Sequence, residues 1–163
     1  MAWWRERLEE LDAGLQPPSE PRLQAVASEL LPRGLTGAQL ARLEDAWLPL
    51  LEPFPWGEEQ AEGLRLRGQI LFGRGAVLLG VGPREAEAAG SLWSIVDGAA
   101  HCSDLPSREF LLHDARRSSA PAKVPRTLRP LTSLAALARS DVQTGGKLSR
   151  VLAAIRHRMT GRL

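Results

Sequence analysis

The chain has 163 residues, of which 44% are hydrophobic and 25% charged, a balance that excludes a disordered protein and predicts one globular domain over residues 1–163. Its net charge is +2, and no nucleic-acid partner is expected. No apolar run approaches the ~20 residues of a membrane-spanning helix. The single cysteine, Cys102, excludes an intrachain disulfide. The N-terminal stretch is too charged for a secretion signal, and both observations favour a cytoplasmic location.

The charge is unevenly distributed along the chain. Residues 1–104 contain 9 Lys and Arg against 16 Asp and Glu, whereas residues 105–163 contain 12 Lys and Arg against 3 Asp and Glu. The acidic part could bind cations or a basic partner, and the basic part suits phosphates, a membrane surface or an acidic protein. Alternatively, the two parts are solvated faces that neutralise each other across one fold.

The N-terminal part is predicted to be helical from the spacing of its apolar residues. The first helix, in AWWRERLEELDAG, ends at Gly14, and the second, in PPSEPRLQAVASELLPRG, has Ser19 as its N-cap. The third, in LTGAQLARLEDAWLPLLEP, begins at Thr36, and Pro49 should kink or end it. The tryptophans are expected to lie in the core or to line a cavity: Trp3, Trp4, Trp47, Trp56 and Trp93.

Helical spacing continues through the rest of the chain. One long helix is predicted in WGEEQAEGLRLRGQILFGRGAVLLG and another in PREAEAAGSLWSIVDGAAHCSD. Their short connection at Gly82 and Pro83 predicts that the two helices are adjacent and nearly antiparallel. Shorter helices follow in SREFLLHDARRSS, RTLRPLTSLAALARSDV and GGKLSRVLAAIRHRMTGRL. Because the sequence has neither a run of β-branched alternation nor an Asn-Gly hairpin turn, the predicted fold class is all-α.

Glycines occur within both long helices, at a cost of about 1 kcal/mol each relative to alanine. They are Gly63, Gly68, Gly73 and Gly75 in the first helix and Gly90 and Gly98 in the second. Glycine inside a helix is typical of a place where another backbone or a ligand comes close. We therefore expect Gly68, Gly73 and Gly90 to allow tight helix packing. The alternative is that the glycines divide each long helix into two.

Three metal-competent side chains, Asp97, His101 and Asp104, are spaced i, i+4 and i+7, which places them on one face of the second long helix. They could form a cation site, the relic of one, or a polar edge. Asp97 and His101 can pair with each other, and Asp104 or Ser103 can cap the next helix, which begins in LPSRE. Since one helix supplies ligands from one side only, no tight Mg²⁺ site is expected here.

The order of the predicted segments resembles the squalene/phytoene synthase family, the head-to-head prenyl transferases with the all-helical isoprenoid-synthase fold. The tryptophan-bearing AWWRERLEEL is similar to the helix that follows the family's first aspartate-rich motif. AEGLRLRGQILFGRGAVLLG resembles a glycine-patterned helix of the family, and AEAAGSLWSIVDGAAHCSD resembles the helix that carries its second aspartate-rich motif. VPRTLRPLTSLAALARSDV is similar to a late helix, so that the resemblance covers nearly the whole chain.

The resemblance implies a helical bundle in which two aspartate-rich helices face each other across a cavity and hold Mg²⁺ ions that bind two prenyl diphosphates. The first motif would lie upstream of AWWRE, so the bundle is expected to be incomplete at the N-terminus. With Gly90 aligned to the family's glycine, His101 stands in place of the first metal-binding aspartate of the second motif, and Leu105 in place of the next. Asp45 matches one acidic position of the family, without a second carboxylate one turn later.

These departures predict a catalytically impaired relative that binds an isoprenoid or another apolar ligand, or acts as a partner or assembly protein. A protein partner or a second copy would then cover the incomplete bundle. One alternative is an active prenyl transferase with Mg²⁺ as cofactor, completed by a missing N-terminal segment or a partner subunit. Another is a helical interaction module with only architectural similarity to the family.

The C-terminal stretch SRVLAAIRHRMTGRL is predicted to form a basic amphipathic helix, in which Arg150, Arg156 and Arg158 could contact an anionic surface. Such a helix can lie peripherally on a membrane; the alternative is an ordinary terminal helix on the protein surface. His113 and Asp114 are expected at a solvated helix edge.

Overall fold

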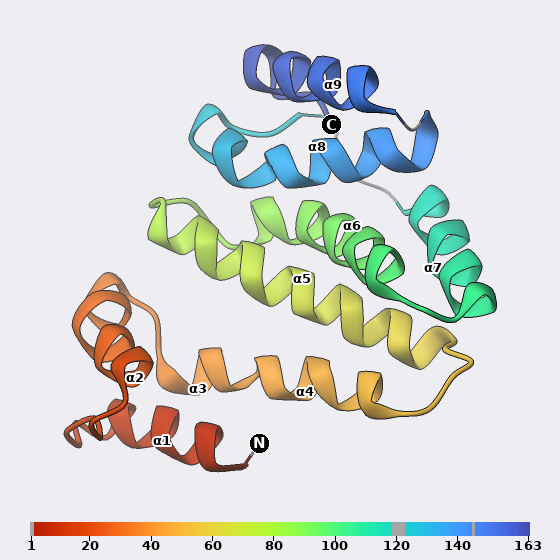
Figure 1. The fold of residues 1–163 in the computed structure, drawn as a ribbon. Coiled ribbons are helices and arrows are strands. Elements are labelled where there is room, and N and C mark those ends of the chain that lie inside the picture. The colour runs from red at the N-terminus through yellow and green to blue at the C-terminus, as the bar shows by residue number, and fades with distance from the viewer. Residues whose placement is uncertain (1, 119–122, 145) are drawn as a thin grey trace.

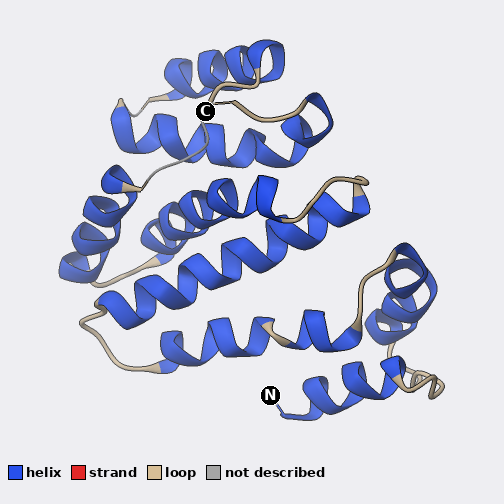
Figure 2. Cartoon of the chain, turned by 180° about the vertical axis from the view of Figure 1, so that it is seen from behind, coloured by secondary structure: helices blue, strands red, loops and turns tan. Residues whose placement is uncertain are grey.

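The computed structural model describes residues 2–118, 123–144 and 146–163, and every regular element within these ranges is helical (Figure 2). The predicted all-α class is therefore confirmed for this part of the chain. The α-helices are α1 (Ala2–Asp12), α2 (Pro21–Ala25), α3 (Gly37–Ala41), α4 (Leu43–Trp47), α5 (Glu58–Leu78), α6 (Arg84–His101), α7 (Leu105–Arg117), α8 (Arg129–Gln143) and α9 (Lys147–Thr160). A turn of π-helix spans Val26–Leu30, and 3₁₀ turns span Leu31–Arg33, Leu48–Leu51 and Arg126–Leu128.

The helices form a stack with α1 at one end and α9 at the other (Figure 1). Helix α1 lies against α3, α4 against α5, α5 against α6, α6 against both α7 and α8, and α8 against α9. The core lies in the middle of this stack. One buried cluster includes Leu64, Ile95 and Leu111, and a second includes Phe72 and Leu128.

Helices α5 and α6 are each continuous and run side by side in opposite directions (Figure 1), as their short connection predicts. Their backbones touch where the two helices cross. A Cβ atom added to Gly68 would lie 2.1 Å from the carbonyl oxygen of Gly90, and one added to Gly90 would lie 2.2 Å from the carbonyl oxygen of Gly68. Any side chain at either position would therefore overlap the other backbone. The alternative in which these glycines break the helices is wrong.

Other glycines make room for side chains on either side of this crossing. A Cβ atom on Gly98 of α6 would lie 2.6 Å from Leu64 Cδ1 of α5, and one on Gly73 of α5 would lie 3.3 Å from Glu87 Oε1 of α6. Glycine thus allows α6 to lie against α5 along several turns, because a larger residue would push the helices apart.

Two helix ends have the terminal residues that the sequence predicts. Gly14 adopts a left-handed conformation with φ +78° after α1, and Thr36 Oγ1 accepts a hydrogen bond from the backbone N–H of Gln39 at 3.1 Å. Ser19, however, is not the N-cap of α2. That position belongs to Glu20, whose carboxylate accepts a hydrogen bond from the backbone N–H of Leu23 at 2.8 Å. The longer acidic side chain reaches the same free N–H group that a serine would otherwise satisfy.

The prediction that the tryptophans lie in the core is wrong for three of the five. Trp3, Trp4 and Trp47 are 37–47% exposed, whereas Trp93 is half-buried and stacks on Phe72 with ring centroids 5.4 Å apart. The reason is the narrow space between the helices, which glycine, alanine and leucine fill and which leaves no room for further indole rings.

Replacing Gly68 with alanine should destabilise the protein by about 2 kcal/mol or more, because the new methyl group would overlap the Gly90 backbone and force the helices apart. Gly82→Ala is the matched control. Its nearest neighbour would be Glu85 Oε1 at 3.8 Å, so its free energy of unfolding should change by no more than about 0.5 kcal/mol. Urea unfolding followed by circular dichroism measures both values, and equal stabilities of the two variants would contradict the crossing described here.

Candidate functional site

The first residue of the predicted metal face, Asp97, is engaged by an arginine of the neighbouring helix. Its carboxylate forms a close ion pair with the guanidinium of Arg67 on α5. The Arg67 side chain is only 12% exposed, and Asp97 is also partly buried. A buried guanidinium needs a compensating charge, and Asp97 supplies it.

Arg67 is also held between two indole rings. Its guanidinium carbon lies 5.1 Å from the ring centroid of Trp47 on α4 and 5.2 Å from that of Trp93 on α6. Cations are attracted to the faces of aromatic rings, and the attraction is stronger where water is excluded. Trp47, Arg67, Trp93 and Asp97, hereafter the Arg67 cluster, therefore join α4, α5 and α6.

The other two residues of the predicted metal face have separate roles. His101 is 79% exposed, and its Nδ1 atom lies 2.8 Å from the Asp97 carbonyl oxygen and 3.7 Å from the Asp97 carboxylate. Asp104 is the N-cap of α7, where its carboxylate accepts hydrogen bonds from the backbone N–H of Ser107 at 3.0 Å and from the Ser107 hydroxyl. The expected capping by Asp104 is thus confirmed. Cys102, between them in the sequence, is buried.

No metal-binding geometry is found on this face. Within residues 2–118, 123–144 and 146–163, no three His, Cys, Asp or Glu side chains come together so that they could hold an ion. Asp45 lies on α4, where its carboxylate is 2.6 Å from Arg5 of α1 and lines a groove of about 420 Å³ together with Pro49 and Leu66. Asp45 and Asp97 each pair with a different arginine, so both carboxylates serve contacts between helices.

A second arginine of α5 forms a network that the sequence analysis missed. Arg65 contacts Glu58 at 2.8 Å, Glu62 at 2.9 Å and Asp114 of α7 at 2.6 Å. Burial of the guanidinium disfavours its charge, but the hydrogen bonds that it donates to these three carboxylates outweigh burial and raise the pKa of Arg65 above its usual value. Asp114 is therefore not at a solvated helix edge as predicted, whereas His113 is exposed.

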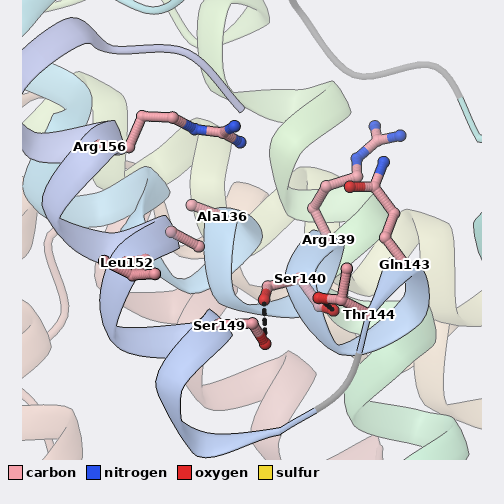
Figure 3. Close-up of a pocket in the computed structure, with 9 residues that line it drawn as sticks. Ala136, Arg139, Ser140, Gln143, Thr144, Ser149, Leu152 and Arg156 are labelled. Atoms are coloured by element: carbon pink, nitrogen blue, oxygen red, sulfur yellow. Dashed lines mark hydrogen bonds between the residues drawn. The ribbon is translucent and has the colours of Figure 1, made fainter.

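A pocket of about 220 Å³ lies between α8 and α9 (Figure 3). Arg156 lines this pocket, and Arg158 is exposed. Arg150 contacts Asp141 of α8 at 3.4 Å. Within the described residues, no helix is long and apolar enough to cross a bilayer.

Comparison with known proteins does not place the chain in a family. No family model matches it, and neither a curated protein nor a solved structure is significantly similar to it.

Exchanging Arg67 for lysine should lower the free energy of unfolding by about 1–2 kcal/mol. Lysine keeps the positive charge, but it lacks the planar guanidinium that lies between the two indole rings. The control Arg22→Lys, on the exposed surface of α2, should change stability by no more than about 0.5 kcal/mol. Urea unfolding followed by tryptophan fluorescence measures both, and a fully stable Arg67→Lys variant would show that the ring contacts contribute nothing.

Proposed function

We propose that this chain is a non-catalytic, squalene/phytoene synthase-like helical protein that acts by binding a protein partner. The observation that carries the proposal is the pairing of Asp97 with Arg67. In the arrangement that the resemblance implies, this part of α6 would present carboxylates to Mg²⁺. Here the Asp97 carboxylate is already paired with the Arg67 guanidinium. A metal cation bound beside this carboxylate would be repelled by the arginine charge.

The positions that correspond to the metal-binding aspartates also support a non-catalytic protein. His101 and Leu105 stand at those positions and are 79% and 66% exposed. A site for two prenyl diphosphates needs carboxylates that converge on a cavity that excludes water. Neither residue is a carboxylate, and the nearby Asp104 caps α7. Prenyl transfer by this helix face is therefore not supported by its contacts.

Exposed large apolar side chains in the part of the stack formed by α1 and α4 support binding to a protein. They belong to α1, α4 and the segment that follows α4, and are here called the aromatic surface: Trp3, Trp4, Trp47, Leu48, Leu51 and Phe54. Helices α1 and α4 are fixed side by side because Arg5 contacts Glu44 at 3.1 Å and Asp45 at 2.6 Å. Tryptophan is enriched among the residues that dominate binding energy at protein interfaces, and exposed apolar patches mark such interfaces.

Purified protein should form no squalene-type or phytoene-type product from prenyl diphosphates with Mg²⁺. Millimolar Mg²⁺ alone should not raise its melting temperature, since Asp97 is already paired with Arg67. Mass spectrometry of the products measures turnover, and thermal unfolding with and without Mg²⁺ measures the melting temperature. Turnover that is lost in Asp97→Ala would overturn the proposal and favour the active prenyl transferase.

Exchanging Trp3 and Leu51 for alanine should remove a specific partner from the tagged protein when it is isolated from its native cells. Truncating two anchoring side chains should weaken binding by on the order of 100-fold or more. The matched control replaces Leu71 and Leu79, which are exposed on α5 and just after it, with alanine and should retain the partner. Quantitative mass spectrometry of the isolated complexes compares them, and equal recovery of every bound protein by both variants would argue against the aromatic surface.

A further inference from the structure

Helix α9 turns its large apolar side chains towards solvent. Five residues with i, i+3 and i+4 spacing lie within a stripe about 100° wide on one side of the helix. Each is 51–74% exposed, and together they are called the α9 stripe: Leu148, Val151, Leu152, Ile155 and Met159. An amphipathic helix at a protein surface normally buries this side against the core. Here the apolar side lacks a covering element among the described residues.

The opposite side of α9 holds the helix on α8 through small and polar groups. The Ser140 hydroxyl lies 3.2 Å from the Ser149 hydroxyl (Figure 3). His157 is fully buried, with its Nε2 atom 2.9 Å from Thr132 Oγ1 of α8. Arg129 donates hydrogen bonds to two carbonyl groups near the end of α9, both at 2.9 Å. These contacts fix the rotation of α9, so the outward direction of its apolar stripe is a property of the fold.

Positive charges flank the α9 stripe on both sides. At about 100° per residue, Arg156 lies beside one edge of the stripe, at the pocket that it lines between α8 and α9, and Lys147 and Arg158 lie beside the other edge. The sequence of the helix, KLSRVLAAIRHRMT, contains no acidic residue. Arg150 projects towards α8, where it pairs with Asp141, and is not part of these flanks.

We propose that α9 binds the surface of a membrane that contains anionic phospholipids. Its apolar stripe would enter the headgroup region while Lys147, Arg156 and Arg158 contact lipid phosphates. At 14 residues and about 21 Å, the helix is too short to cross a bilayer and would lie flat on it. Pairing of two copies through α9 is disfavoured, because it would bring the cationic flanks of both copies together.

The membrane surface and the proposed partner surface are independent. Helix α9 and helix α1 lie at opposite ends of the stack (Figure 1). A membrane-bound molecule would therefore hold the aromatic surface away from the lipid, and failure of one proposal leaves the other unchanged.

Flotation with vesicles tests the membrane proposal. The full chain should float with vesicles of phosphatidylcholine mixed with phosphatidylglycerol, bind vesicles of pure phosphatidylcholine weakly, and be released by salt, which screens the charge attraction. The double variant Leu148→Glu/Ile155→Glu should bind on the order of 100-fold more weakly, because it places two charges in the stripe. The matched control Leu105→Glu/Leu71→Glu has the same net charge and changes exposed residues of α7 and α5, and its binding should be unchanged.

A second variant keeps the test informative if the first one unfolds. Arg156→Gln/Arg158→Gln leaves the stripe intact and should lower affinity for the mixed vesicles by on the order of 30-fold. Absence of flotation by the wild-type chain, or equal loss in the α7/α5 control, would overturn the proposal. A lipid-free dimer that Ile155→Glu dissociates would also overturn it, because the stripe would then be covered by a second copy.

Discussion

The contact between the backbones of Gly68 and Gly90 is the constraint on which the rest of the stack depends. It sets the distance between α5 and α6. Helices α4, α7 and α8 pack on this pair, and α9 packs on α8. Helix α4 approaches α5 at Gly63, where an added Cβ atom would lie 3.0 Å from the Ala46 carbonyl oxygen. Helix α8 approaches at Gly75, where Leu131 fills the space of the absent side chain. Small residues thus set how closely α4, α6 and α8 approach α5.

Charged groups add a second level of connection between the layers. Arg65 and Arg67 are two residues apart on α5, so they project to different sides of that helix. Arg65 pairs with Asp114 of α7, and Arg67 pairs with Asp97 of α6. Of the acidic residues that suggested a cation site in the sequence, Asp97 pairs with Arg67 of α5 and Asp45 with Arg5 of α1, while Asp104 caps α7. These pairings are the observations that support the proposal of a non-catalytic binding protein.

The helices and the pairing of α5 with α6 could be predicted from the sequence, because apolar spacing and a short connection are local signals. The capping by Asp104 could be predicted for the same reason. The partner of Asp97 could not be predicted, since Arg67 lies 30 residues earlier and the direction of its side chain depends on how two helices cross. Sequence also could not show that the exposed Trp47 covers the largely buried Arg67, because an indole ring fits a core equally well.

Helix α9 is held on α8 mainly by hydrogen bonds between polar groups. Of its residues, only His157 is fully enclosed, so separation from α8 exposes little apolar area. The free energy of that local opening is correspondingly small compared with unfolding of the α5–α6 core. We therefore expect α9 to separate from α8 more readily than the middle of the stack unfolds.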